Sequence, residues 1–271
     1  MASQSLVQLD RRAVVALAGP DWRDFLQNLI TQDVGDLTVG EIRFGALLTP
    51  QGRLLYDLFL HGREDGCLID CEAAHREALI GRLTMYRLRA KVTIAPDEAP
   101  VLALWGGKSA PEGWGRDPRL PELGWRAIGA PPPDGVTRVD SAAYEAHRLA
   151  LGVPGSEDYG SEKTYPIEAD FDLLAGIDFR KGCYVGQETT SRMKRRGQIR
   201  NRMVPIAFEG EPPPFGTELL AGELRAGEAL GVHGDRAMAL LRLDRLEAGP
   251  LTFADGQPWR PLWPDWLPRE G

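Results

Sequence analysis

The sequence predicts an α+β fold made of a large N-terminal domain, residues 1–197, and a small C-terminal β-barrel, residues 198–271. Three observations support this prediction. Helices and strands are mixed, but the strands follow one another mainly as hairpins and not as alternating βαβ units. A length of 271 residues suits one large domain plus a smaller one. After residue 200 the pattern changes to short strands separated by Gly and Pro turns, which is typical of a barrel or sandwich.

In the first half of the chain, alternating apolar residues predict strands at 6–9 and 13–18, joined as a hairpin by Asp10, Arg11 and Arg12. Asp21 is a good N-cap for a helix, because apolar residues recur at helical spacing from Trp22 onward. The following elements are a hairpin of strands at 41–49 and 54–61, a strand at 67–71, a helix at 73–88 and a strand at 91–95.

The second half contains a strand at 101–105, a Pro/Gly-rich stretch at 106–135 that includes a strand at 124–128, and a helix at 141–151. Gly152 and Pro154 give that helix a usual stop signal. A short helix is expected from Gln187 to about Arg195. The barrel strands are expected at 201–208, 217–220, 229–233 and 236–243.

The composition, with 43% hydrophobic and 26% charged residues, is that of an ordinary globular protein, and no run is long enough for a membrane-spanning helix. The first residues lack the features of a secretory signal or an Arg-rich transit peptide. Three cysteines are too few for a disulfide framework and indicate a reducing compartment. We therefore expect a cytoplasmic protein without membrane partners.

The usual self-sufficient catalytic motifs are absent from the sequence. It has no phosphate-binding loop, dinucleotide fingerprint or nucleophile elbow. The four histidines are scattered without metal-ligand spacing, so no metal site is expected. Three cysteines cannot supply the four thiolates of an ordinary iron–sulfur cluster within one chain.

Charge is unevenly distributed along the chain. The net charge is −7, yet residues 180–202 contain eight basic residues and one acid, so that window carries +7 and the remainder −14. Such a stripe on an acidic protein favours focused binding of an anion, with Arg192, Lys194, Arg195 and Arg196 as the candidates. A solvated helix face, an acidic protein partner and RNA are the alternatives.

The stripe adjoins the segment Lys181-Gly182-Cys183-Tyr184-Val185-Gly186-Gln187-Glu188. Glycines allow sharp turns and close approach of the backbone, and a thiol just before a helix N-terminus beside cations is favoured as the thiolate. The alternative is an inert cysteine buried at a tight strand-to-helix turn.

This segment resembles the signature of the YgfZ group, the iron–sulfur-associated branch of the folate-binding family that includes the T-protein (aminomethyltransferase) of the glycine cleavage system. Four further stretches resemble the family in the same order. They are residues 25–34, the hairpin at 48–57 with its Gly52, the helix end at 145–154, and Tyr165-Pro166-Ile167-Glu168. The last two also resemble the mitochondrial relatives at least as closely.

The resemblance implies a ferredoxin-like folate-binding domain of the T-protein type followed by a β-barrel. It implies an accessory protein that binds tetrahydrofolate and supports assembly or repair of iron–sulfur clusters, particularly in [4Fe–4S] enzymes, with iron–sulfur assembly proteins or client enzymes as partners. By this resemblance Cys183 is the functional thiol and Lys181 its cationic neighbour, and a transient cluster can be bound. Gly182, Gly186, Gln187 and Glu188 shape the motif. The folate contacts are expected from Arg148, Glu168, Asp70 and Tyr184.

Two other functions fit parts of the pattern. One is a folate-dependent aminomethyl or methyl transferase, for which Asp70 is the nearest candidate for the pocket aspartate of the T-protein. The other is an RNA-binding factor linked to tRNA modification, which would use the basic stripe.

Overall fold

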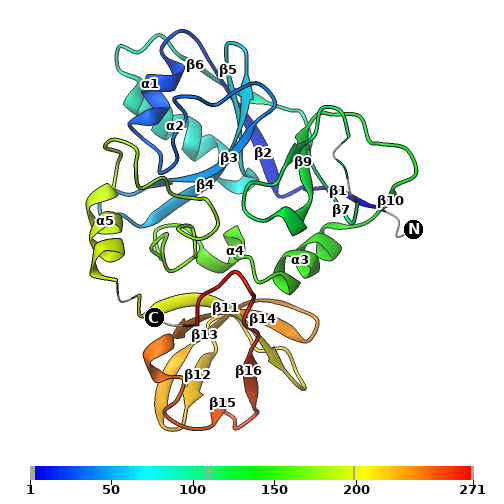
Figure 1. Ribbon diagram of the computed structural model, residues 1–271, viewed down its shortest axis with the longest axis vertical. Helices are drawn as coiled ribbons and strands as arrows, with labels where there is room; N and C mark the ends of the chain where they lie inside the picture. The colour runs from blue at the N-terminus through cyan, green and yellow to red at the C-terminus, as the bar shows by residue number, and fades with distance from the viewer. Residues whose placement is uncertain (1–3, 108, 110, 198, 270–271) are drawn as a thin grey trace.

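Three sheets organise the protein, which we describe from a computed structural model at residues 4–107, 109, 111–197 and 199–269 (Figure 1). Sheet A has the order β10 (Thr137–Arg138), β1 (Ser5–Gln8), β7 (Val101–Trp105), β9 (Trp125–Ile128), β8 (Gly115–Arg116). Sheet B has the order β3 (Ile42–Leu48), β4 (Leu54–Arg63), β5 (Gly66–Glu72), β2 (Arg12–Ala18), β6 (Thr93–Asp97). Both lie in the upper part of Figure 1, with the third sheet below them.

Sheet B has two different faces because successive side chains of a strand point in opposite directions. On β4, Leu58 and Leu60 pack into a core with α1 (Trp22–Gln27) and α2 (Arg76–Arg87), which cover the outer face. Asp57, Phe59 and His61 alternate with them and therefore face the middle of the molecule. The inner face of sheet B therefore carries polar groups.

The expected first hairpin is wrong, although both of its strands exist. β1 pairs with β7 and β10 in sheet A, whereas β2 pairs along seven residues with β5 in sheet B. The chain crosses between the two sheets at Leu9–Arg11. At the start of β2, the Arg12 side chain bonds Asp57 and Asp70 of sheet B, and these bonds hold β2 there. Ladder length and this buried ion pair override the local turn signal.

The helices differ in detail from the expectation. Asp21 does not cap α1 with its side chain; the carboxylate accepts a hydrogen bond from the Lys91 backbone instead, at 2.7 Å. The helix expected at 73–88 divides into a 3₁₀ turn, η1 (Ala73–His75), and α2. The turns α4 (Ser156–Tyr159) and η2 (Pro121–Leu123) and the short strands β8, β10, β15 and β16 were not expected.

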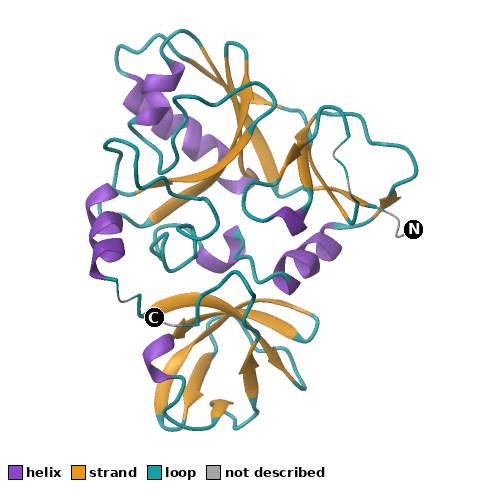
Figure 2. Cartoon of the chain, viewed as in Figure 1, coloured by secondary structure: helices purple, strands orange, loops and turns teal. Residues whose placement is uncertain are grey.

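Sheet C forms a nearly closed barrel, with the order β15 (Leu251–Phe253), β12 (Glu218–Ala221), β13 (Leu224–His233), β14 (Arg236–Arg242), β11 (Asn201–Phe208), β16 (Trp259–Pro261). A bridge between Thr252 and Pro258 connects its two ends. Figure 2 shows that the barrel consists almost entirely of strands, apart from one short helical turn, η3 (Leu243–Arg245). The fold is thus α+β with a C-terminal barrel, as expected.

A single apolar cluster joins the upper part to the barrel. It contains Phe44 and Phe59 from sheet B, Leu149 from α3 (Ser141–Ala150), and Met203 and Met238 from the barrel. In Figure 1, α3 and α4 lie between sheets A and B and the barrel. Buried apolar contacts of this kind hold the parts in fixed positions.

Candidate functional site

The Cys183 thiol lies on a loop whose preceding residue is anchored in the protein. The buried ammonium of Lys181 donates hydrogen bonds of 2.8 Å to the carbonyl oxygens of Ile30 and Gln32, and lies 5.4 Å from the centre of the Tyr184 ring. Burial lowers the pKa of Lys181 to about 8, against the attraction of Asp33 and Asp178. Lys181 therefore fixes the loop from inside, while Gly182 and Cys183 are exposed.

The other end of the loop is fixed by two glycines from distant parts of the chain. Gly186 has φ +79° and Gly52, in the β3–β4 turn, has φ +85°. A Cβ on Gly186 would lie 2.5 Å from the Thr49 carbonyl oxygen, and one on Gly52 would lie 2.9 Å from the Gly186 oxygen. The β3–β4 turn thus packs directly on the start of α5 (Gln187–Arg196). Both positions need glycine for their conformation and for their space.

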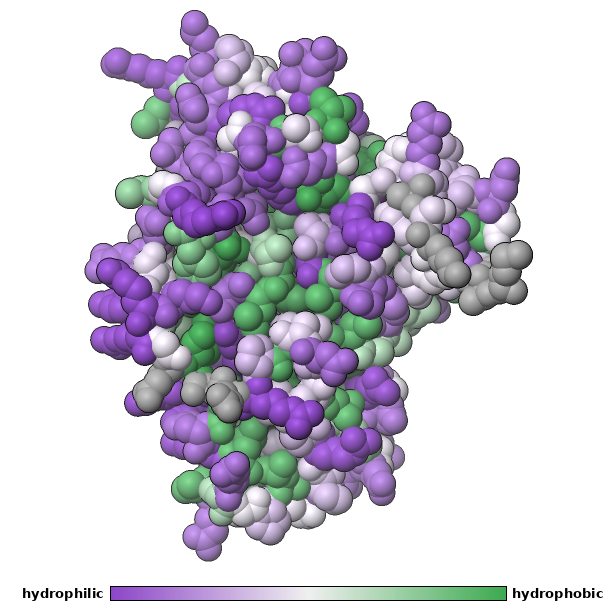
Figure 3. Space-filling model, viewed as in Figure 1, coloured by the Kyte–Doolittle hydropathy of each residue, from purple (hydrophilic) through white to green (hydrophobic). Residues whose placement is uncertain are grey.

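An exposed cationic helix follows the thiol. The side chains of Arg192, Lys194, Arg195 and Arg196 are exposed on α5 and form the hydrophilic edge at the left of Figure 3. Phe179, 38% exposed, lies before the thiol in the chain, and the Lys194 Nζ is 5.2 Å from its ring centre. The motif residues Gln187 and Glu188 form the first turn of α5, and Gln187 Nε2 is 3.5 Å from the Gly182 oxygen.

Cys183 differs from the other two cysteines in its exposure. Cys67 and Cys71 lie on β5 and are buried, and burial raises the pKa of each thiol to about 12. They are therefore protonated and inert at neutral pH. Cys183 is the one exposed thiol of the three.

The middle of the molecule is filled by arginines and not by an open pocket. The guanidinium carbons of Arg126, Arg119 and Arg12 lie 3.8, 4.8 and 5.3 Å from the centre of the Phe59 ring. Asp57, Asp70 and Asp117 pair with these three cations. Stacked and paired groups of this kind are fixed in orientation.

Asp70 is fully occupied by this cluster. One carboxylate oxygen accepts from Arg12 Nε at 2.6 Å and the other accepts from Arg126. Burial would raise the pKa of Asp70, but Arg12 and Arg126 together hold it below its ordinary value. Neither oxygen is available to activate the amine of a folate.

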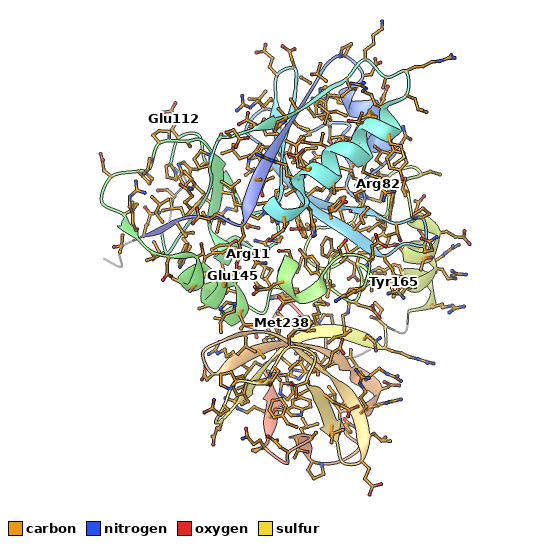
Figure 4. The ribbon with its side chains drawn as sticks, turned by 180° about the vertical axis from the view of Figure 1, so that it is seen from behind. Arg11, Arg82, Glu112, Glu145, Tyr165 and Met238 are labelled. Carbon is orange, nitrogen blue, oxygen red and sulfur yellow. The ribbon has the colours of Figure 1, made fainter. Side chains whose placement is uncertain are left out.

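The cavity that remains beside the arginine cluster has a volume of about 70 Å³. It opens toward the back of the molecule, where Arg11 and Glu145 lie (Figure 4). Arg148 lines it, but this guanidinium is buried and paired with Glu145, Glu157 and Asp158. Ligand pockets usually have volumes of about 300–1,000 Å³, so a folate does not fit in this cavity.

The structure does not bring the four expected folate residues together. Arg148 lines the small cavity, and Asp70 does not line it but binds Arg12 and Arg126, which do. The Glu168 carboxylate instead accepts from Tyr165 N and from Asn201 Nδ2 at the start of β11. Tyr184 is buried in the apolar cluster between sheet B and the barrel. Glu168 therefore connects its own loop to the barrel.

A larger opening lies beside Lys181 and was not expected from the sequence. This cleft has a volume of about 640 Å³ and is lined by Phe44, Pro118, Gly35, Ala175 and several polar side chains: Gln32, Asp33, Asp36, Arg43, Asp178, Arg180 and Lys181. The one available signal was the family-like stretch at 25–34, which supplies Gln32 and Asp33.

Glu145, Glu157 and His233 form the one group of potential metal ligands found among the described residues, with their ligand atoms within 4.8 Å of one another. The carboxylates already bind guanidinium groups, since Arg148 contacts both and Arg11 contacts Glu157 at 2.8 Å. His233 Nε2, on β13, lies 3.0 Å from the Glu157 carboxylate. We interpret the group as an ion-pair junction between α4 and the barrel. No helix among the described residues is long and apolar enough to cross a membrane.

The crystal structure of the glycine cleavage system aminomethyltransferase T from Bartonella henselae superposes with a TM-score of 0.78 and 18% sequence identity, covering 99% of this chain and 88% of that one. Residues 200–269 match the family model of the CAF17 C-terminal β-barrel domain. The protein therefore has the fold of a glycine cleavage aminomethyltransferase with a CAF17-type barrel.

Sequence relatives define the family more narrowly. The human mitochondrial iron–sulfur cluster assembly factor IBA57 is 31% identical over 98% of this chain and 86% of its own length. The mouse protein of the same name is 32% identical over 96% and 85%. The chain belongs to the IBA57 family of iron–sulfur cluster assembly factors. A place in the YgfZ group itself stays a prediction.

Proposed function

We propose that this chain is an accessory factor for the assembly or repair of iron–sulfur clusters, particularly those of [4Fe–4S] enzymes, and that Cys183 is the group that meets the cluster. One observation supports this most strongly: the single exposed thiol sits on a loop that is fixed by Lys181 on one side and by Gly186 on the other. The relatives named above are assembly factors, which agrees with this role.

The thiol would act as a ligand to iron in a cluster that a partner protein also holds. The Cys183 thiol loses its proton to solvent, and the sulfur donates an electron pair to an iron atom, with no change in oxidation state. Cys67 and Cys71 are buried and cannot complete a four-thiolate site, so the remaining ligands come from the partner. The fixed loop keeps the orientation of the thiol constant, which lowers the entropy cost of forming the shared site.

The exposed cations of α5 would orient that partner. Charged surfaces mainly raise association rates and specificity, so an acidic face on the cluster-bearing protein is the complementary surface. The partners that this predicts are iron–sulfur assembly proteins and client enzymes. Their encounter with this chain should weaken as salt rises, because exposed charges are screened.

Alkylation of Cys183 tests the proposal directly. The protein is mixed anaerobically with an apo [4Fe–4S] enzyme, with and without iron and sulfide, and the iodoacetamide-modified fraction of Cys183 is measured by mass spectrometry. We expect protection of Cys183 only when the cluster forms, and loss of that protection after an iron chelator is added. Equal alkylation with and without the cluster would reject the role of this thiol.

We further propose that tetrahydrofolate, if it is a ligand of this chain, occupies the cleft beside Lys181. A volume of about 640 Å³ suits a ligand of that size, whereas the central cavity does not. Phe44 and Pro118 supply apolar lining, Asp33 and Asp178 offer acceptors for pterin N–H groups, and Arg180 offers a cation for the glutamate tail. When bound, the folate would supply a one-carbon carrier.

Arg180 provides a clean test of folate binding, because its side chain is 93% exposed. Arg180→Gln should weaken tetrahydrofolate binding measured by calorimetry, while Arg89→Gln, an exposed arginine that does not line the cleft, should leave it unchanged. Absence of binding to the wild-type protein would remove folate from the proposal and leave the role of Cys183 intact.

The two alternative functions are less well supported. An aminomethyl transferase needs a free pocket carboxylate, and both oxygens of Asp70 are occupied, so we expect no turnover of an aminomethyl donor. A link to tRNA modification through RNA binding would rest on α5. It predicts tRNA affinity that falls steeply with salt, and no binding at low salt would dismiss it.

A further inference from the structure

A second small cavity lies between sheets A and B and shares no lining residue with the cleft beside Lys181. It has a volume of about 120 Å³ and is lined from β4 and β5 by His61, Gly62, Arg63 and Leu68, and from β9 by Arg126 and Ile128. The remaining lining comes from residues 40–42 and from Gly113 and Gly115. Nothing in the proposed function uses this cavity.

Two side chains that line the cavity carry buried polar atoms without a hydrogen-bond partner among the described residues. They are Nε2 of His61 and Nε of Arg126. Leaving a buried polar atom unpaired costs stability, so such atoms usually have a partner that is a water molecule or a ligand. Two such atoms, on side chains that come from two different sheets and line the same cavity, are consistent with a common partner.

The other groups of Arg126 are already engaged. Its terminal nitrogens bind Asp70 and the Tyr144 hydroxyl, which leaves the Nε–H as the unused donor. Burial lowers the pKa of His61 to about 4. Arg126 and Arg63 lower this pKa further, whereas Asp70 and Asp117 act to raise it. The imidazole is therefore neutral at pH 7, and its Nε2 donates in one of its two tautomers.

Among the cations near the cavity, Arg63 is the one without a carboxylate partner among the described residues. The cations Arg12, Arg119 and Arg126 are balanced by Asp57, Asp70 and Asp117. Glu41 also lines the cavity, but its carboxylate is bound by Arg43 and Thr38. Arg43 also binds Asp36, so Glu41, Arg43 and Asp36 together carry one net negative charge. Arg63 is exposed and has no ion pair among the described residues, so its guanidinium is available to pair with a ligand.

We propose that this cavity binds a small monocarboxylate, which accepts hydrogen bonds from Arg126 Nε and His61 Nε2 and pairs with Arg63. The volume corresponds to about four water molecules, so a carboxylate of about three to five non-hydrogen atoms fills it. The dissociation constants that the best ligands of that size reach lie between about millimolar and about micromolar, so we expect a weak site.

The test uses the full-length protein and two probes, formate and acetate, added as sodium salts at constant ionic strength with chloride as the reference anion. The histidine side-chain resonances are followed by NMR. We expect saturable shifts of the His61 signals at about millimolar carboxylate, with no saturable shift of the His75 signals.

Two variants separate the site from general effects. Arg63→Gln changes only an exposed side chain and should weaken carboxylate binding about tenfold, while Arg89→Gln should leave it unchanged. His61→Phe removes the NMR reporter, so its carboxylate binding is measured by calorimetry and should be abolished. If His61→Phe does not fold, the titrations of the wild-type protein and of Arg63→Gln still decide whether the cavity binds a carboxylate. Linear, non-saturable shifts that chloride reproduces would show a cavity that holds water only, and would overturn the proposal.

Discussion

Lys181 is the residue whose replacement tests the architecture of the thiol loop most sharply. Its ammonium is buried and its pKa is lowered to about 8 from an ordinary value of 10.5. In the unfolded chain the amine binds its proton more tightly, so the unfolded state carries more protons between those two values. Stability contributed by this group must therefore rise as pH increases through that window.

The magnitude follows from the shift. About 2.5 pKa units at 1.36 kcal/mol each give about 3 kcal/mol of destabilisation at neutral pH, which disappears above about pH 10.5. About 2 kcal/mol of this is recovered between about pH 7 and pH 9.5. The neutral amine keeps two N–H groups, enough for the carbonyl oxygens of Ile30 and Gln32, so the loop stays anchored.

The assay is urea unfolding of the wild-type protein and of Lys181→Met at both pH values. Methionine removes the titration, so the wild-type stability relative to the variant should increase by about 2 kcal/mol on going to the higher pH. Other groups that titrate in this range affect both proteins and cancel in the difference. An unchanged difference, or one that decreases, would refute the buried, proton-binding Lys181.

Three further predictions concern the rest of the core and the loop. Arg126→Leu should lower the free energy of unfolding by about 3 kcal/mol, because Asp70 and Asp117 lose a buried partner. Arg138→Leu, on the exposed strand β10, should change it by less than about 0.5 kcal/mol. Similar urea midpoints for the two variants would contradict the buried cluster. Gly186→Ala should lower the free energy of unfolding by about 1–3 kcal/mol, because φ is +79° and the new Cβ meets the Thr49 oxygen. Gly182→Ala has open space for its Cβ and should leave the free energy of unfolding unchanged in the same assay. Equal effects of the two changes would disprove the packing of the β3–β4 turn on α5. A thiol reagent at neutral pH should modify one cysteine in the native protein and all three in denaturant, because burial raises the pKa of Cys67 and Cys71 to about 12; more than one rapidly modified thiol in the native state would argue against that burial.

Much of the fold could be predicted because the alternation of apolar residues marks strands directly. The strands of sheet B and most strands of the barrel lie close to their expected positions. The pairing of the strands could not be predicted in the same way. The alternation of apolar residues shows that a segment is a strand, but it does not show with which strand or in which sheet that segment pairs. The strands β1 and β2 illustrate this: a short turn suggested a hairpin, but each strand finds a partner far away in the sequence.

The site shows the same division between local and distant information. The turn glycines and the start of α5 follow from residues within the motif, and the structure has both. Lys181 looks like a cation beside the thiol in the sequence, yet its ammonium binds carbonyl groups about 150 residues away in the chain. Arg148 looks like an anion ligand, but buried carboxylates surround it. Charged residues inside otherwise apolar strands, such as Asp70 and Arg126, were the available sign of a buried ion-pair cluster.

The central claim is that the Cys183 thiol carries the function of this chain. The most direct measurement is the activity of [4Fe–4S] enzymes in cells that lack the gene and express either Cys183→Ala or Gly182→Ala at matched protein levels. We predict that Gly182→Ala, which keeps the thiol and has open space for its Cβ, restores activity and that Cys183→Ala does not. Full recovery with Cys183→Ala would contradict the account.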